Sequence, residues 1–219
     1  MLFTAATWNC QGSPMKGAKR ELLDEMMEKF PVIMLQEAGN PSAWDLKDGE
    51  PGAFQNFHAI VFSDPAAFNL RCSVGLLIHP AMDVKSFDSI NSASSLRPLV
   101  YAKLGDGGIV GSFHAIASAL ASSDWKAVHK KLTDDGKPTW LVVGGDFNAD
   151  LVDRLEVETN NVNGVLGGIT QKSGKSLDGF HSSGKITQFG GTFRIFPSSQ
   201  SGSRFGFVSD HQALGCNFR

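Results

Sequence analysis

Short apolar runs recur along the chain, and polar or glycine-rich segments separate them. The clearest run is residues 140–145, Trp-Leu-Val-Val-Gly-Gly, whose continuous apolar character is typical of a buried strand. Comparable runs occupy residues 2–8, 32–35, 54–62, 72–78, 84–90, 99–104, 109–113, 192–196, 204–208 and 212–218. We expect these runs to form strands, except that residues 192–196 and 204–208 are predicted to be either strand or loop pieces. Asp106-Gly107-Gly108 is expected to form a hairpin turn between two of the strands.

Helical patterns are fewer than strand patterns. The spacing of apolar residues predicts a helix that ends near Phe30, with Ser13 as its N-cap and Pro14 at its first position. Two shorter helices are predicted at residues 125–132 and 151–157. The first of these follows a run of serine and aspartate, which are common at the start of a helix.

The remaining segments are poor in apolar residues. Residues 160–168 are rich in asparagine and glycine, which predicts loops around a short strand, and residues 170–184 are polar. The excess of strands over helices favours an α/β sandwich, because a doubly wound sheet needs a helix between most strands. No repeat or linker divides the chain, so we expect one domain over residues 1–219.

The composition is that of a globular protein. With 219 residues, 42% of them hydrophobic and 19% charged, the chain can bury a sizeable core without disulfides. A net charge of −2 argues against a protein that coats nucleic acid, so phosphate binding would depend on a few placed residues and a metal ion. Cys10, Cys72 and Cys216 lack a metal-ligand spacing, which favours buried free thiols. A single disulfide between two of them is the alternative.

Polar side chains stand at the ends of many predicted strands. Residues two apart on an extended backbone point to the same side, so Asp146 and Asn148 direct a carboxylate and a carboxamide to one place. Taken alone, this pair is more typical of an Asx turn that caps a strand. The same arrangement recurs at Asn9, Glu37, Arg71, Arg97, His114, Asp210 and His211. So many polar strand ends predict a common rim on which these side chains converge.

The residue types on this rim suit phosphate chemistry. Glu37 and Asp210 offer the carboxylate oxygens that Mg²⁺ prefers, and Asn9 can add a carbonyl oxygen. His114 and His211 can give or take a proton near neutral pH. These types together favour a metal-assisted reaction at phosphorus.

Two arginines and four further histidines complete the candidates. Arg71 and Arg97 can form forked hydrogen bonds to phosphate oxygens, and each is equally consistent with an ordinary surface position. The remaining histidines have no carboxylate pattern around them, which indicates surface or packing roles. They are His58, His79, His129 and His181.

Several short motifs, in their order along the chain, resemble the endonuclease/exonuclease/phosphatase superfamily with its DNase I-like fold. They are Trp8-Asn9, Gln36-Glu37, Gly145-Asp146-Phe147-Asn148 and Ser209-Asp210-His211. Residues 7–13, 33–39, 97–98, 113–117 and 140–144 are similar to the catalytic B subunits of cytolethal distending toxins. Ser173-Gly174 with Leu177-Asp178 resembles a further motif of those subunits, with Gly179 in place of an aromatic residue. The resemblance spans residues 4–218.

This resemblance implies a four-layered α/β sandwich, in which two central, mostly antiparallel or mixed sheets lie between helices. It also implies hydrolysis of phosphodiesters with a divalent ion, which is Mg²⁺ or alternatively Mn²⁺ or Ca²⁺. His211 is then the general base with Asp210 beside it, and Asp210 also belongs to the metal site. Glu37 is the metal ligand, with Asn9 nearby.

The other roles follow from the same resemblance. His114 is the second catalytic histidine, and Asp178 orients it. Asp146 and Asn148 position the attacking water and the phosphate. Arg71 and Arg97 resemble phosphate-contacting arginines.

The favoured function is a DNA endonuclease that makes nicks, as a toxin nuclease does. A phosphoinositide phosphatase of the same fold and a catalytically silent binding module are the alternatives. The implied partners are DNA, or phosphoinositide in the alternative, together with delivery subunits of a toxin complex. The loops at residues 40–54 and 190–207 are short compared with the toxin subunits, in surfaces that would contact such partners.

The sequence contains no membrane-spanning apolar run and no leader pattern. We therefore expect either a cytoplasmic protein or a secreted one whose leader has been removed. A toxin-like role would place its action in the nucleus of a target cell.

Overall fold

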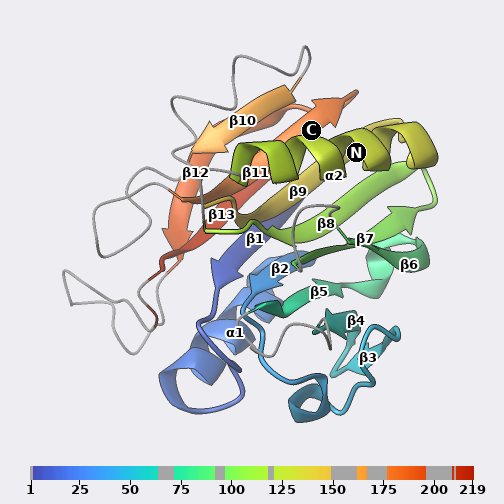
Figure 1. The fold of residues 1–219 in the computed structure, drawn as a ribbon. Coiled ribbons are helices and arrows are strands. Elements are labelled where there is room, and N and C mark those ends of the chain that lie inside the picture. The colour runs from blue at the N-terminus through green and yellow to red at the C-terminus, as the bar shows by residue number, and fades with distance from the viewer. Residues whose placement is uncertain are drawn as a thin grey trace.

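The computed structural model describes residues 2–63, 72–91, 97–117, 121–148, 162–166, 177–195, 209 and 211–219. Its strands form two sheets (Figure 1). The seven-stranded sheet runs in the order β12 (Gln188–Ile195), β13 (Ala213–Phe218), β1 (Phe3–Asn9), β2 (Val32–Gln36), β5 (Val74–Ile78), β4 (Phe57–Phe62) and β3 (Gly52–Phe54). The six-stranded sheet runs in the order β10 (Val162–Leu166), β11 (Asp178–Gly184), β9 (Trp140–Asp146), β8 (Gly108–His114), β7 (Pro98–Leu104) and β6 (Val84–Asn91).

Both sheets are mixed. β1 pairs with β2 in parallel, and β8 pairs with β9 in parallel. The other pairs between described strands are antiparallel. The helices are α1 (Gly17–Lys29) and α2 (Ala121–Gly136), with short 3-10 turns at Pro41–Trp44 and Pro80–Met82. Each parallel pair is joined through one helix, because a parallel connection must return the chain to the same end of the sheet.

The alternation of side chains along each strand explains the layers. On β9, Trp140 and Val142 belong to the apolar core between the sheets, whereas Leu141 and Val143 pack on the opposite face, in the cluster that holds α2. Both faces of this strand are therefore buried, which is why its sequence is continuously apolar.

The helices cover the two outer faces. α1 packs Leu22 and Met26 against the seven-stranded sheet, and α2 packs Trp125 and Val128 against the six-stranded sheet. Burying one such side chain stabilises the fold by roughly 1.5–3 kcal/mol. The order of layers is α1, seven-stranded sheet, six-stranded sheet, α2, which confirms the predicted four-layered sandwich (Figure 1).

Some predicted elements differ from the structure. α1 begins at Gly17 rather than at Pro14, with Lys16 as an extended N-cap residue that makes no capping hydrogen bond through its side chain. α2 is longer than predicted and runs from Ala121 to Gly136. Part of the polar segment at 170–184, for which no strand was predicted, is the strand β11. The predicted helix at 151–157 and strand at 204–208 lie outside the described residues.

The other differences are smaller. The run at 54–62 is a hairpin of β3 and β4, and the predicted short strand near residue 164 is β10. Cys10 and Cys216 are buried free thiols as predicted, and Cys72 is a half-buried free thiol. Within the described part of the chain, no helix has the length and apolar character that a membrane crossing requires.

The two glycines at the end of β9 allow close approach of other backbone and side chains. A Cβ at Gly145 would lie 2.0 Å from the carbonyl oxygen of Phe113. A Cβ at Gly144 would lie 2.5 Å from the sulfur of Met34, in the opposite sheet. These contacts let β9 sit tightly against β8 and β2, which brings the ends of all three strands together.

Candidate active site

The predicted rim exists at one end of the two sheets. Asp146 ends β9, and its partners in register are His114 at the end of β8 and Asp178 at the start of β11. All three lie on the side of the six-stranded sheet that faces the other sheet, and none is more than 2% exposed. Asn9 ends β1 in the opposite sheet and donates to Asp146 across the gap.

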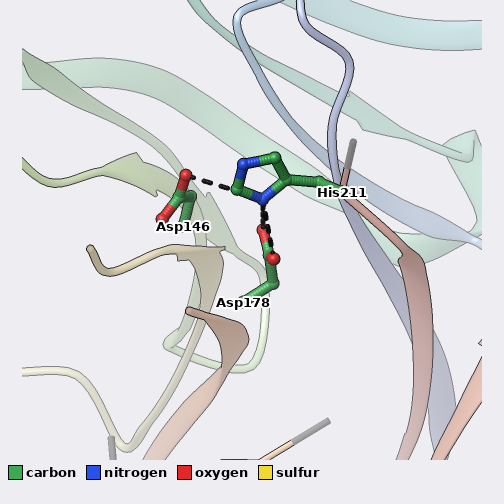
Figure 2. A group of neighbouring side chains, drawn as sticks. All are labelled: Asp146, Asp178 and His211. Atoms are coloured by element: carbon green, nitrogen blue, oxygen red, sulfur yellow. Dashed lines mark hydrogen bonds and ion pairs between the residues drawn. The ribbon is translucent and has the colours of Figure 1, made fainter. Parts of the chain in front are cut away.

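His211, which lies two residues before the start of β13, is beside two carboxylates (Figure 2). Its Nδ1 is 2.8 Å from Asp178 Oδ2 and 3.1 Å from Asp178 Oδ1. The same nitrogen is 3.8 Å from Asp146 Oδ2. Because a carboxylate accepts hydrogen bonds, Asp178 favours the tautomer with the proton on Nδ1, and the lone pair is then on Nε2.

Asp146 is the most connected carboxylate of the site. Its Oδ2 accepts from Asn9 Nδ2 at 2.9 Å, and its Oδ1 accepts from the backbone N–H of Asn148 at 3.0 Å. Burial, and next the negative charge of Asp178, raise the pKa of Asp146 to about 7, although His211 and the two hydrogen bonds oppose this shift. Asp146 can therefore change its protonation state close to neutral pH.

The second histidine lies on the other side of Asp146. His114 Nε2 is 3.6 Å from Asp146 Oδ2 and 2.6 Å from Arg97 Nη1. A guanidinium only donates, so His114 Nε2 accepts and the ring is neutral in this arrangement. Arg97 Nη1 also donates to the carbonyl of Ala115 at 2.6 Å, and Asn148 Nδ2 donates to that same carbonyl at 2.8 Å.

Glu37 directly follows β2 and is 8% exposed. Its φ of 51° lies in the left-handed region, which breaks the alternation of the strand at this residue. The carbonyl of Glu37 accepts from the N–H of Gly12 at 2.9 Å, and Asn9 is in register with Gln36. The strained turn thus holds a buried carboxylate at the strand end next to Asn9.

Two groups of residues can hold a cation. Glu37 and Asn9 offer the hard oxygen donors that suit Mg²⁺. Within the described residues, one group of three has ligand atoms that all lie within 4.8 Å of one another, namely Asp146, Asp178 and His211. This group includes an imidazole nitrogen that already bonds Asp178, and nitrogen suits a transition metal better than Mg²⁺.

The structure therefore brings together most of the predicted site residues. The described ones are Asn9, Glu37, Arg97, His114, Asp146, Asn148, Asp178 and His211. Arg71 and Asp210 lie outside the described residues. One implied role is corrected, because Asp178 bonds the ring of His211 rather than orienting His114. The backbone pairing places Asp178 and His114 on opposite sides of β9.

Some contributing residues were not predicted. Ser209 Oγ accepts from the N–H of His211 at 2.9 Å and lies 2.9 Å from the carbonyl oxygen of Asn9, so it ties His211 to the end of β1. Gln36, Thr7 and Ser112 form a buried polar cluster beneath the site. The only signal in the sequence was that each is a polar residue inside an otherwise apolar strand or a recognised motif.

Sequence comparison places the chain within one family. Residues 6–211 match the model of the Endonuclease/Exonuclease/phosphatase family. The match covers almost the whole chain and includes every described residue of the site, from Asn9 to His211. No curated protein sequence matches the chain.

Solved structures share the fold at low sequence identity. The cytolethal distending toxin of Actinobacillus actinomycetemcomitans is 19% identical with a TM-score of 0.70, over 98% of this chain and 97% of the other. The human Nocturnin catalytic domain with bound sulfate is 16% identical with a TM-score of 0.73, over 100% and 94%. TDP2 of D. rerio in complex with single-strand DNA product is 14% identical with a TM-score of 0.69, over 100% and 99%.

Proposed function

The chain belongs to the endonuclease/exonuclease/phosphatase family, whose members hydrolyse phosphate esters, and from this premise we propose that it is a metal-dependent endonuclease that nicks DNA. The observation that carries the proposal is the buried pair of His211 and Asp178 beside Asp146 (Figure 2). A histidine held by one carboxylate next to a second carboxylate is the arrangement that a general base requires.

His211 removes the proton from the attacking water. Its Nδ1 is bound to Asp178, which keeps the ring in one tautomer and one orientation. Nε2 then accepts the proton, and the two neighbouring carboxylates balance the positive charge that forms on the ring. General base catalysis of this kind contributes on the order of 10²–10⁴-fold to a rate.

Asp146 orients the water and the phosphate. It is fixed by Asn9 and by the backbone of Asn148, so its carboxylate cannot rotate freely. Because its pKa is raised to about 7, Asp146 can accept a hydrogen bond from the attacking water when ionised and donate one to a phosphate oxygen when protonated. A carboxylate that is positioned before the substrate arrives loses little entropy in the reaction.

Arg97 and His114 stabilise the leaving side of the phosphate. The guanidinium adds a permanent positive charge to the rim, and its contacts to His114 and Ala115 hold it there. Charge builds up on the phosphate oxygens in the transition state, so a fixed cation lowers the barrier. His114 can act as the general acid once Nε2 takes up a proton from solvent in place of the hydrogen bond from Arg97, and it then gives that proton to the leaving oxygen.

Glu37 and Asn9 would hold the divalent ion. Their donor set fits, because a buried carboxylate and an amide oxygen at adjacent strand ends are ligands that Mg²⁺ accepts. When bound, the ion supplies Lewis-acid chemistry at a phosphoryl oxygen.

DNA is supported as the substrate by one similar structure, in which TDP2 of D. rerio is in complex with single-strand DNA product. The net charge of −2 is consistent with a nuclease that contacts DNA through a few site residues rather than a basic surface.

A plasmid assay with a lipid control tests the proposal. Wild-type protein with Mg²⁺ should convert supercoiled plasmid to open circles, and EDTA should stop the reaction. The same preparation should release no inorganic phosphate from vesicles that contain phosphatidylinositol trisphosphate. Phosphate release without nicking would replace the proposal by a phosphatase function, and neither activity across Mg²⁺, Mn²⁺ and Ca²⁺ would leave a binding module.

A further inference from the structure

Three buried polar side chains connect the two sheets directly beneath the candidate site. Gln36 Nε2 donates to Ser112 Oγ at 3.0 Å and lies 3.2 Å from Thr7 Oγ1, to which it also donates. Ser112 Oγ in turn donates to the carbonyl of Leu35 at 2.9 Å. Gln36 and Thr7 belong to the seven-stranded sheet and Ser112 belongs to the six-stranded sheet. We call Thr7, Gln36 and Ser112 the inter-sheet bridge.

The inter-sheet bridge lies between the apolar core and the site. On β8, Ser112 stands between Val110, which belongs to the core between the sheets, and His114. On β1, Thr7 stands two residues before Asn9 and so faces the same way. The bridge is therefore the last layer of the core and the floor of the site.

The inter-sheet bridge is polar, whereas the adjacent core between the sheets is apolar. All three of its side chains are 0% exposed, and a buried polar group destabilises a fold unless its hydrogen bonds are made. Apolar packing would have filled the same space, but it has no preferred direction. Hydrogen bonds have a preferred length and angle, so the bridge holds the two sheets at a set separation.

That separation matters because the candidate site is divided between the sheets. The seven-stranded sheet carries Asn9, and it leads into Glu37 at the end of β2. The six-stranded sheet carries His114, Asp146 and Asp178. A phosphate must contact both halves at once, so their distance fixes whether water, phosphate and cation ligands align.

Gln36 is one of the residues that join the two halves, in addition to Asn9, which donates to Asp146. Gln36 directly precedes Glu37, so a single peptide unit joins the two residues, and the φ of Glu37 is 51°. Its amide reaches Ser112, which lies two residues before His114. A shift of Gln36 would therefore move Glu37 relative to the six-stranded half of the site, which carries His114, Asp146 and Asp178.

We propose that Gln36 is a positioning residue, which sets the distance between Glu37 and the six-stranded half of the site through its hydrogen bond to Ser112. The proposal rests on the proposed phosphodiesterase function and adds a residue that touches neither substrate nor cation. A misplacement of reacting groups by about 1 Å can reduce a rate by roughly 10²-fold.

The test uses Gln36→Met and Ser112→Ala, with Ser182→Ala as the matched control. Methionine keeps the length and apolar volume of glutamine and removes its donors. Ser182 is also a buried serine of the six-stranded sheet, and it lies four residues along β11 from Asp178. Each variant is assayed for kcat and KM on a short fluorogenic DNA duplex with Mg²⁺, and its folded fraction is measured by urea unfolding.

The expected result is a specific loss of kcat. Gln36→Met should lower kcat per folded molecule by roughly 10- to 100-fold with little change in KM. Gln36→Met combined with Ser112→Ala should be no slower than Gln36→Met alone, because both changes break the same bond. Ser182→Ala should keep the wild-type kcat.

Three results would overturn the proposal. One is an unchanged kcat in Gln36→Met with only a lower unfolding midpoint, which would make the bridge purely structural. Another is independent, additive losses from the two substitutions. A third is an inactive wild-type protein, and this result alone would also remove the proposed function.

Discussion

Two buried histidines near opposite faces of β11 show how surroundings decide what an imidazole can do. His211 is 5% exposed and bonds Asp178, which faces the space between the sheets. His181 is 1% exposed and lies on the other face of the strand, beneath α2. The two histidines are buried to a similar degree, but the residues around them differ.

The neighbours of His181 are aromatic. Its ring centroid is 4.7 Å from those of Trp125 and Phe147, and neither ring nitrogen has a hydrogen-bond partner within the described structure. Burial, and next the charge of His129, lower the pKa of His181 to about 3. His181 is therefore neutral at any physiological pH, whereas His211 has carboxylates to balance a proton. A carboxylate partner turns a packing residue into a base.

Replacement of His211 should have the largest effect on activity. His211→Ala removes the proton acceptor and should lower kcat by about 10²–10⁴-fold. Nicking of plasmid under single-turnover conditions measures this loss without interference from product release. A His211→Ala protein that nicks at the wild-type rate would show that another group is the base.

Replacement of the partner of His211 should have a smaller effect. Asp178→Asn keeps the shape of the side chain, but it removes the negative charge and allows the wrong tautomer of the ring. We expect kcat to fall by roughly 10- to 100-fold, as for other residues that orient a functional histidine. Measurement of kcat for Asp178→Asn and His211→Ala under the same conditions tests which substitution costs more. A larger loss in Asp178→Asn would point to a direct role for the carboxylate.

The protonation of His181 should affect the stability of the protein rather than its activity. Because the pKa of His181 is about 3 in the fold and 6.5 in the unfolded chain, the unfolded state binds more protons between these values. Stability is full above pH 6.5 and falls with decreasing pH until about pH 3. The loss from this residue between neutral pH and about pH 5 should be roughly 2 kcal/mol.

Urea unfolding at the two pH values measures this effect. His181→Phe keeps an aromatic ring in the cluster and should lose less stability on acidification than the wild type. His58→Gln is the control, because His58 is exposed on β4 and should leave the pH dependence unchanged. Equal acid sensitivity of His181→Phe and the wild type would contradict the account of this histidine.

The arginine on the rim should contribute least. Arg97→Lys keeps the charge but loses the planar guanidinium, whose Nη1 donates to both His114 and the carbonyl of Ala115. The loss of one such hydrogen bond should lower kcat/KM by about three- to tenfold. Arg194→Lys, on exposed β12, is the matched control and should show no change. A loss as large as that of His211→Ala would make Arg97 essential to the chemistry.

Much of the fold was predictable, because the central strands carry their own pattern. β1, β2, β8 and β9 are mostly apolar, and each is almost entirely buried on both faces. β11 was missed, since Asp-Gly-Phe-His-Ser-Ser-Gly is polar and becomes a strand through pairing with β9 and β10. Such pairing depends on residues far away in the chain, and no local pattern reveals it.

The candidate site, like the fold, was predictable only in part. Polar strand ends identified Asn9, His114 and Asp146, and a motif resemblance added Asp178. Which carboxylate serves which histidine was not predictable, because Asp178 and His211 are 33 residues apart and meet only through the packing of the two sheets. The left-handed turn at Glu37 and the inter-sheet bridge likewise arise from tertiary contacts.

The difference between the two histidines is tested most directly by one comparison of nicking rates. Wild type, His211→Ala and His181→Phe are given the same supercoiled plasmid with Mg²⁺ at pH 7, and rates are expressed per folded molecule. The wild type and His181→Phe should nick equally fast, and His211→Ala should be slower by about 10²–10⁴-fold. Equal rates for His211→Ala and the wild type, or no nicking by any of the three, would contradict the assignment of this site.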